Sequence, residues 1–239
     1  MRGEWVGVRV DAVEEWSRAQ QRVIDLVADL PAERAALRVP ACPDWTVRDL
    51  LSHMVGLGAD VVAGDEPDDH NAEWTSRQVQ VRRDRDVPAL VAEWQAVAEP
   101  LRAWMRANTV RPLNDVLIHE QDLRGALEVP GGQDAEGWAA IRERFTGRLA
   151  GRVGDLPPIA LVGDDGWAWV SRDAVDDAAV VLQAPTFDLT RALVTRRSAA
   201  QLKGWTVRGD VGPYLDAFAM LGPLPTTDLT ESGPAGAGG

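Results

Sequence analysis

The sequence is poor in cysteine and has no long apolar run, and each shortage excludes a class of protein. Cys42 is the only cysteine among 239 residues, so no internal disulfide can form, which suits a reducing cytoplasm. No run approaches the ~20 apolar residues that a membrane helix needs. The first residues also lack the apolar stretch of a secretory signal. We therefore expect a cytoplasmic protein with no membrane partner.

Basic residues are outnumbered by acidic ones. The chain has 25 Lys and Arg residues against 37 Asp and Glu residues, which gives a formal net charge of −12. Proteins that follow a nucleic-acid backbone present basic surface, so we expect no nucleic-acid partner. Lys203 is the single lysine. This preference for arginine indicates GC-rich codons, as expected of an actinobacterial genome.

The first part of the chain has the pattern of amphipathic helices. Apolar side chains recur every three or four residues there. Thr46 and Asp49 form the pattern of a capping box at one helix start, and Gly64 suits the end of that helix. The helices that we expect cover 11–30, 46–63, 71–85, 87–108, 112–128 and 133–151.

After about residue 154 the pattern changes to short apolar runs. The runs 159–162 and 167–170 flank a loop from Gly163 to Gly166, which is a hairpin signal. Further strands are expected over 178–183 and 205–208, and further helices over 187–197 and 213–221. The predicted fold is thus an all-helical domain over 1–153, a small α+β domain over 154–224 and a disordered tail over 225–239.

Two of the three histidines lie on predicted helices in a pattern suited to a metal ion. Asp115 precedes His119 by four residues, so the carboxylate and the imidazole lie one turn apart on the same helix face. His53, from another helix, would complete a three-ligand set with an open position, as in catalytic metal sites. Asp122 lies on the same face as His119 and is a candidate acceptor that orients this imidazole.

A plainer interpretation stays open at this point. A histidine near a helical core is usually only a hydrogen-bonded core residue, and a carboxylate four residues before a histidine is also a simple helix pair. Cys42, between Ala41 and Pro43, is expected to pack as a small residue and not to act as a reactive thiol.

Two segments resemble a known family. Pro-Asp-Trp-Thr-Val-Arg-Asp-Leu-Leu-Ser-His, ending at His53, is similar to the opening signature of the mycothiol-dependent maleylpyruvate isomerase family, a branch of the DinB-like metal-binding four-helix bundles. Asp-Val-Leu-Ile-His-Glu-Gln-Asp-Leu, starting at Asp115, resembles its second signature, which has Glu in place of Asp. The resemblance implies an N-terminal DinB-like four-helix bundle, with His53, Asp115 and His119 as metal ligands.

The resemblance also implies an activity. A divalent ion, most simply Zn²⁺ with Ni²⁺, Fe²⁺ and Mn²⁺ as alternatives, would activate the low-molecular-weight thiol mycothiol. We expect an isomerase or thiol transferase that acts on a small carboxylic acid or electrophile. Arg197 resembles an arginine of the family's C-terminal domain that serves the site, here by binding the substrate carboxylate.

Two other interpretations stay open beside this one. The departure at Asp115, whose side chain is one methylene shorter than Glu, favours a non-catalytic module that binds a metal or ligand as a sensor. The other is a metal-free homologue in which both histidines belong to the core.

Overall fold

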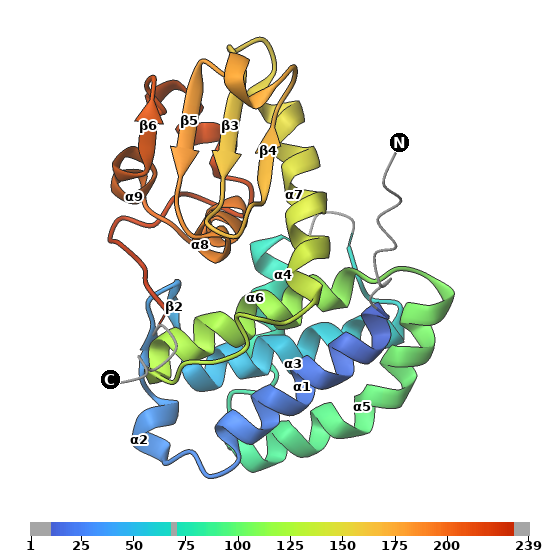
Figure 1. The fold of residues 1–239 in the computed structure, drawn as a ribbon. Coiled ribbons are helices and arrows are strands. Elements are labelled where there is room, and N and C mark those ends of the chain that lie inside the picture. Colours follow the sequence, from blue (N-terminus) through green and yellow to red (C-terminus); the bar gives the residue numbers. More distant parts are fainter. Residues whose placement is uncertain (1–10, 68–70, 232–239) are drawn as a thin grey trace, which may run out of the picture. The chain divides into compact units, whose positions relative to one another are not determined.

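The computed structural model describes residues 11–67 and 71–231 (Figure 1). The chain divides into two compact units, and the described part of the second unit runs from Trp138 to Glu231. This division falls after the first residue of the helix Gly137–Val153. That helix was assigned to the first domain from the sequence, with the border placed at 153/154. The division into domains over 1–153 and 154–224 stays a prediction.

The first unit is helical. Its long helices α1, α3, α5 and α6 are joined by the shorter α2 and α4, and two short antiparallel strands, β1 and β2, precede α3. No strand was predicted from the sequence at this place. The bounds are Ala12–Val27 (α1), Ala32–Ala35 (α2), Arg38–Val39 (β1), Cys42–Thr46 (β2), Val47–Ala63 (α3), Ala72–Gln80 (α4), Val87–Ala107 (α5) and Arg111–Leu127 (α6).

The four long helices enclose the core of the first unit. Helix α1 packs against α5 and α6, and α3 packs against the same two helices and against α4 (Figure 1). Trp16 and Trp94 meet edge to face in this core, with ring centroids 6.4 Å apart. None of the described helices is long and apolar enough to cross a membrane.

Local sequence signals set both ends of α3, the helix that carries His53. Thr46 caps its start in a reciprocal capping box with Asp49, as predicted. Gly64 ends it in the left-handed region, with φ at 75°. Near the middle, a Cβ added to Gly56 would lie 2.6 Å from the Cβ of Gln78. This glycine therefore lets α4 approach α3 closely.

The second unit is a small α+β structure, as expected. Its four-stranded sheet has the order β4-β3-β5-β6, with β3 and β5 parallel and the outer pairs antiparallel. The predicted hairpin is confirmed by β3 and β4. The bounds are Gly137–Val153 (α7), Ile159–Val162 (β3), Ala168–Val170 (β4), Val180–Gln183 (β5), Thr186–Leu193 (α8), Ala199–Gly204 (α9), Thr206–Arg208 (β6) and Leu215–Phe218 (α10).

Two features of the second unit differ from the sequence prediction. Helix α8 ends at Leu193, before the predicted end at Arg197, because Thr195 takes a left-handed φ of 60°. The tail was predicted to be disordered from residue 225, but Leu229 is buried and Glu231 pairs with two arginines. Residues 232–239, the rest of that predicted tail, lie outside the described residues.

Candidate metal centre

The side chains of His53, Asp115 and His119 converge on one point between α3 and α6. The Nε2 atom of His53 lies 3.3 Å from Oδ1 of Asp115, and the Nε2 atom of His119 lies 3.4 Å from the same oxygen. One ligand atom from each of the three residues lies within 4.8 Å of the others. The spatial convergence expected from the sequence is therefore present.

The separations match the spacing that a small metal ion requires. An ion held tetrahedrally by nitrogen and oxygen at about 2.0–2.1 Å keeps neighbouring ligand atoms roughly 3.3–3.4 Å apart. The oxygen of Asp115 already stands at this distance from both imidazole nitrogens. The shorter aspartate thus reaches the point of convergence without the extra methylene of a glutamate.

A hydrogen-bond chain fixes the orientation of the His53 ring. Its Nδ1 lies 2.7 Å from Oε1 of Gln78, whose Nε2 donates to Asp60 at 2.8 Å. Since a carboxylate can only accept, the amide nitrogen of Gln78 must face Asp60 and its oxygen must face the imidazole. Nδ1 of His53 therefore donates a proton, and in the neutral ring the lone pair of Nε2 points toward Asp115.

The His119 ring is also oriented by a hydrogen bond at its Nδ1 atom, here to a residue of its own helix. Its Nδ1 lies 2.9 Å from Oδ2 of Asp122, one turn further along α6. Asp122 is the residue that the sequence analysis singled out as the orienting acceptor. Its side chain has no exposed surface, and its Oδ2 also accepts a long hydrogen bond of 3.8 Å from the thiol of Cys42. Both imidazoles therefore direct Nε2 to Asp115.

The three candidate ligands are mostly buried, to different degrees. The side chain of His53 is 5% exposed, that of His119 is 12% exposed and that of Asp115 is 18% exposed. The Trp45 ring lies 5.0 Å from that of His53, and the two histidine rings meet edge to face at 5.1 Å. Asp115 is thus the most exposed of the three candidate ligands.

The donor atoms of this arrangement suit a cation. Two imidazole lone pairs and a carboxylate oxygen face one another, which is unfavourable unless a proton or a metal ion lies among them. Two neutral nitrogens and one carboxylate form a donor set suited to Zn²⁺ and related divalent ions. The residues present therefore fit a metal ion.

Arg197, the predicted substrate-binding cation, belongs to the second unit and is engaged there. Its guanidinium group donates to Asp188 at 2.9 and 2.6 Å, to the carbonyl of Arg196 at 2.6 Å, and to both carboxylate oxygens of Glu231. Burial by itself would lower the pKa of Arg197, but the bonds to Glu231 and Asp188 outweigh it and raise that pKa. Every N–H of the group has an acceptor.

Two contributors to the site were not predicted from the sequence. Gln78 lies on α4, and no spacing in the sequence relates it to His53 on α3. Cys42 was expected only to pack, yet it forms a second group of potential ligands with His119 and Asp122. Its position on β2, just before the capping box, was the signal that could have placed it beside the site.

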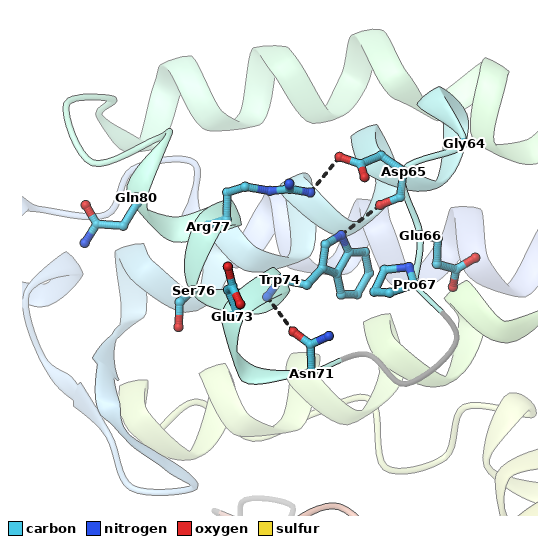
Figure 2. Close-up of a pocket in the computed structure, with 10 residues that line it drawn as sticks. All are labelled: Gly64, Asp65, Glu66, Pro67, Asn71, Glu73, Trp74, Ser76, Arg77 and Gln80. Carbon is cyan, nitrogen blue, oxygen red and sulfur yellow. Dashed lines mark hydrogen bonds and ion pairs between the residues drawn. The ribbon is translucent and has the colours of Figure 1, made fainter.

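A pocket of about 610 Å³ lies elsewhere on the first unit, between the end of α3 and α4 (Figure 2). Trp74 forms part of its wall and donates from Nε1 to the carbonyl of Asp65, whose carboxylate pairs with Arg77 at 2.6 Å. His53, Asp115 and His119 do not line it. This pocket is therefore separate from the convergent ligand set.

One comparison with known proteins finds a match. A family model described as the mycothiol maleylpyruvate isomerase N-terminal domain matches residues 16–124. The matched range contains His53, Asp115, His119 and Asp122, and it ends before the second unit begins. Neither a curated protein nor a solved structure matches the chain.

Proposed function

Residues 16–124 belong to the mycothiol maleylpyruvate isomerase N-terminal domain family, and from this premise we propose that the protein is a metal-dependent enzyme that uses a low-molecular-weight thiol. The helices α1, α3, α5 and α6 are proposed to form its DinB-like four-helix bundle. The observation that carries the proposal is the shared direction of the Nε2 atoms of His53 and His119 toward Asp115.

His53, Asp115 and His119 would hold the ion, with Zn²⁺ the first candidate. Such an ion lowers the pKa of a coordinated thiol and so supplies a thiolate near neutral pH. Gln78 and Asp122 keep the two rings in the tautomer that binds. The 18% exposure of Asp115 leaves the side by which a thiol such as mycothiol would enter.

The proposed reaction class is isomerisation or thiol transfer on a small carboxylic acid or electrophile. In an isomerisation, the thiol adds across a cis double bond, the resulting single bond rotates, and elimination of the same thiol leaves the trans isomer. In a transfer, the new carbon–sulfur bond stays and a leaving group departs. Arg197 as the residue that binds the substrate carboxylate stays a prediction.

The first experiment measures the metal itself. We expect the purified protein to contain about one divalent ion per chain, and the variants His53→Ala and His119→Ala to lose it. Asp25→Asn, which removes an exposed carboxylate of α1, is a control that should keep the ion. Wild-type metal content in both histidine variants would end the proposal.

The second experiment tests catalysis. The metal-loaded protein is supplied with mycothiol and maleylpyruvate, or with a panel of electrophiles, and product formation is followed with and without the thiol. Thiol-dependent turnover that disappears in His119→Ala supports the enzyme. Metal binding without turnover of any substrate favours the alternative, a metal- or ligand-binding sensor. The observation that motivates this alternative is Asp115, which stands where the family signature has Glu.

A further inference from the structure

The pocket between the end of α3 and α4 has walls that are bonded to each other (Figure 2). Trp74 on α4 donates from Nε1 to the carbonyl of Asp65 at 2.9 Å, and Nη2 of Arg77 lies 2.6 Å from the Asp65 carboxylate. Asn71 caps the start of α4 by accepting a hydrogen bond from the backbone N–H of Trp74 at 2.9 Å. These bonds fix the cavity before any ligand enters, as in most small-molecule sites.

One face of α4 presents a polar stripe to this pocket. Its members recur at spacings of three and four, which places them on the same side of the helix, and all of them line the pocket: Glu73, Ser76, Arg77 and Gln80. Within residues 11–67 and 71–231, the side chain of Arg77 donates only to Asp65, and the other three side chains make no hydrogen bond. The stripe therefore keeps both donors and acceptors for a ligand.

The charges around the pocket favour a neutral ligand. Asp65 is compensated by Arg77, and Glu66 is compensated by Arg111 at 2.7 Å. Glu73 and Arg77 lie one helical turn apart, so an anion at the guanidinium group also meets a carboxylate, and a cation at Glu73 also meets Arg77. A hydroxyl group avoids both repulsions, because it can donate to a carboxylate and accept from a guanidinium group. A ligand with several hydroxyl groups is thus the best match to the stripe.

Apolar surface beside the stripe suits the carbon skeleton of such a ligand. Trp74 is 5% exposed, so its indole is held in place by packing as well as by the bond to Asp65. Pro67 lines the same pocket. Small-molecule sites combine apolar walls with a few polar groups, and the cavity of about 610 Å³ falls within their usual range of roughly 300–1,000 Å³. A saturated ring that carries several hydroxyl groups fits this combination.

We propose that this pocket binds a neutral cyclic polyol of the size of a monosaccharide, and that the polar stripe of α4 holds its hydroxyl groups. The carbon skeleton of the ligand lies against Trp74 and Pro67. None of the three candidate metal ligands lines the pocket. The proposal therefore concerns a second site, which does not depend on the metal centre or on the proposed thiol chemistry.

Saturation-transfer NMR on the full chain tests the proposal, with glucose, galactose and mannose as probes. We expect at least one of these sugars to bind with a Kd on the order of 1 mM, because its hydroxyl groups exchange bonds to water for bonds to the protein. Glu73→Ala and Gln80→Ala should each raise this Kd about fivefold, the effect of one lost hydrogen bond. The double variant Glu73→Ala, Gln80→Ala should show no saturation transfer to the sugar.

Matched substitutions away from the pocket show whether the effect is local. The double variant Asp25→Ala, Gln95→Ala removes one carboxylate and one amide from exposed positions of α1 and α5, and should bind the sugar as wild type does. All the substituted positions are exposed, so every variant should keep the wild-type circular dichroism spectrum. Ser76→Ala, the smallest change in the stripe, gives the same test of affinity if a larger change lowers the helix content.

The ligand class is decided by two charged sugars, protonated glucosamine and glucuronate. A neutral sugar should bind at least as tightly as either of them. Binding of a charged sugar alone, or of no sugar at all, would overturn the proposal. Saturation transfer that persists unchanged in the double variant Glu73→Ala, Gln80→Ala would place the sugar elsewhere on the protein, which also contradicts it.

Discussion

The side-chain amide of Gln78 donates to Asp60 at 2.8 Å, and this bond decides which end of the amide faces His53. Because the carboxylate accepts the amide N–H, the amide oxygen is left for the imidazole. A residue of α4 thereby sets the tautomer of a residue of α3. The ring is oriented by the fold itself, before any ion binds.

Replacing Gln78 should therefore weaken metal binding without removing a ligand. We expect Gln78→Leu to lose about 10–100-fold in metal affinity, the range typical of residues that orient a ligating histidine. Competition with a chromogenic chelator measures the affinity. Gln80→Leu, an exposed position on the same helix, is the matched control. Equal affinity in Gln78→Leu and wild type would show that the His53 ring does not depend on this bond.

The ligand set could be predicted from the sequence because its information is local. Asp115 and His119 are one helical turn apart, and His53 belongs to a short segment with a recognisable helix start at Thr46. Periodicity likewise predicted the long helices, since each buries one apolar face. Each of these signals is contained within a single helix.

Contacts between distant segments could not be predicted in this way. Gln78 reaches His53 only because Gly56 lets two helices approach. Glu231 comes from a stretch rich in proline and glycine whose composition predicted disorder, yet its carboxylate meets two arginines 34 and 40 positions earlier. Such pairings depend on tertiary packing and leave no periodic trace in the sequence.

We expect metal binding to survive the substitution Asp115→Glu better than Asp115→Asn. Asp115→Asn keeps the size but removes the negative charge facing the two imidazoles, so we expect metal affinity to fall by at least about tenfold. Asp115→Glu restores the residue of the family signature and should retain the ion. The two variants are compared by metal content and chelator competition. Full retention of the ion by Asp115→Asn would exclude Asp115 as a ligand.

Cys42 should be dispensable for the ion. Its thiol donates to Asp122 at 3.8 Å, a long contact on the far side of the His119 ring from Asp115. We expect Cys42→Ser to keep the wild-type stoichiometry and affinity, because the hydroxyl can donate to the same carboxylate. With Co²⁺ as the probe ion, wild type and variant should give the same absorption spectrum. A thiolate-to-metal band present only in wild type would instead make Cys42 a ligand.

Gly56 should not accept even one added carbon. Its Cβ would lie 2.6 Å from Cβ of Gln78, so Gly56→Ala forces α3 and α4 apart and should cost about 1–3 kcal/mol in unfolding free energy. Gly147→Ala is the matched control in α7, where an added Cβ meets nothing within 4 Å. There alanine should stabilise by up to about 1 kcal/mol. Chemical denaturation measures the unfolding free energy of both variants. If Gly56→Ala changes it no differently from Gly147→Ala, the close approach of α3 and α4 is refuted.

Glu231 should make the second unit sensitive to acid. Burial raises its pKa, but the charges of Arg191 and Arg197 outweigh burial and hold the pKa below the ordinary 4.5. A lowered folded-state pKa contributes stability that is present above about pH 4.5 and is lost as the pH falls through the folded value. Unfolding free energy measured against pH should therefore decline more steeply below pH 4.5 in wild type than in Glu231→Gln, which cannot titrate. Parallel curves for the two proteins would show that the pKa of Glu231 is the same in the folded and unfolded states, and so contradict the lowered pKa.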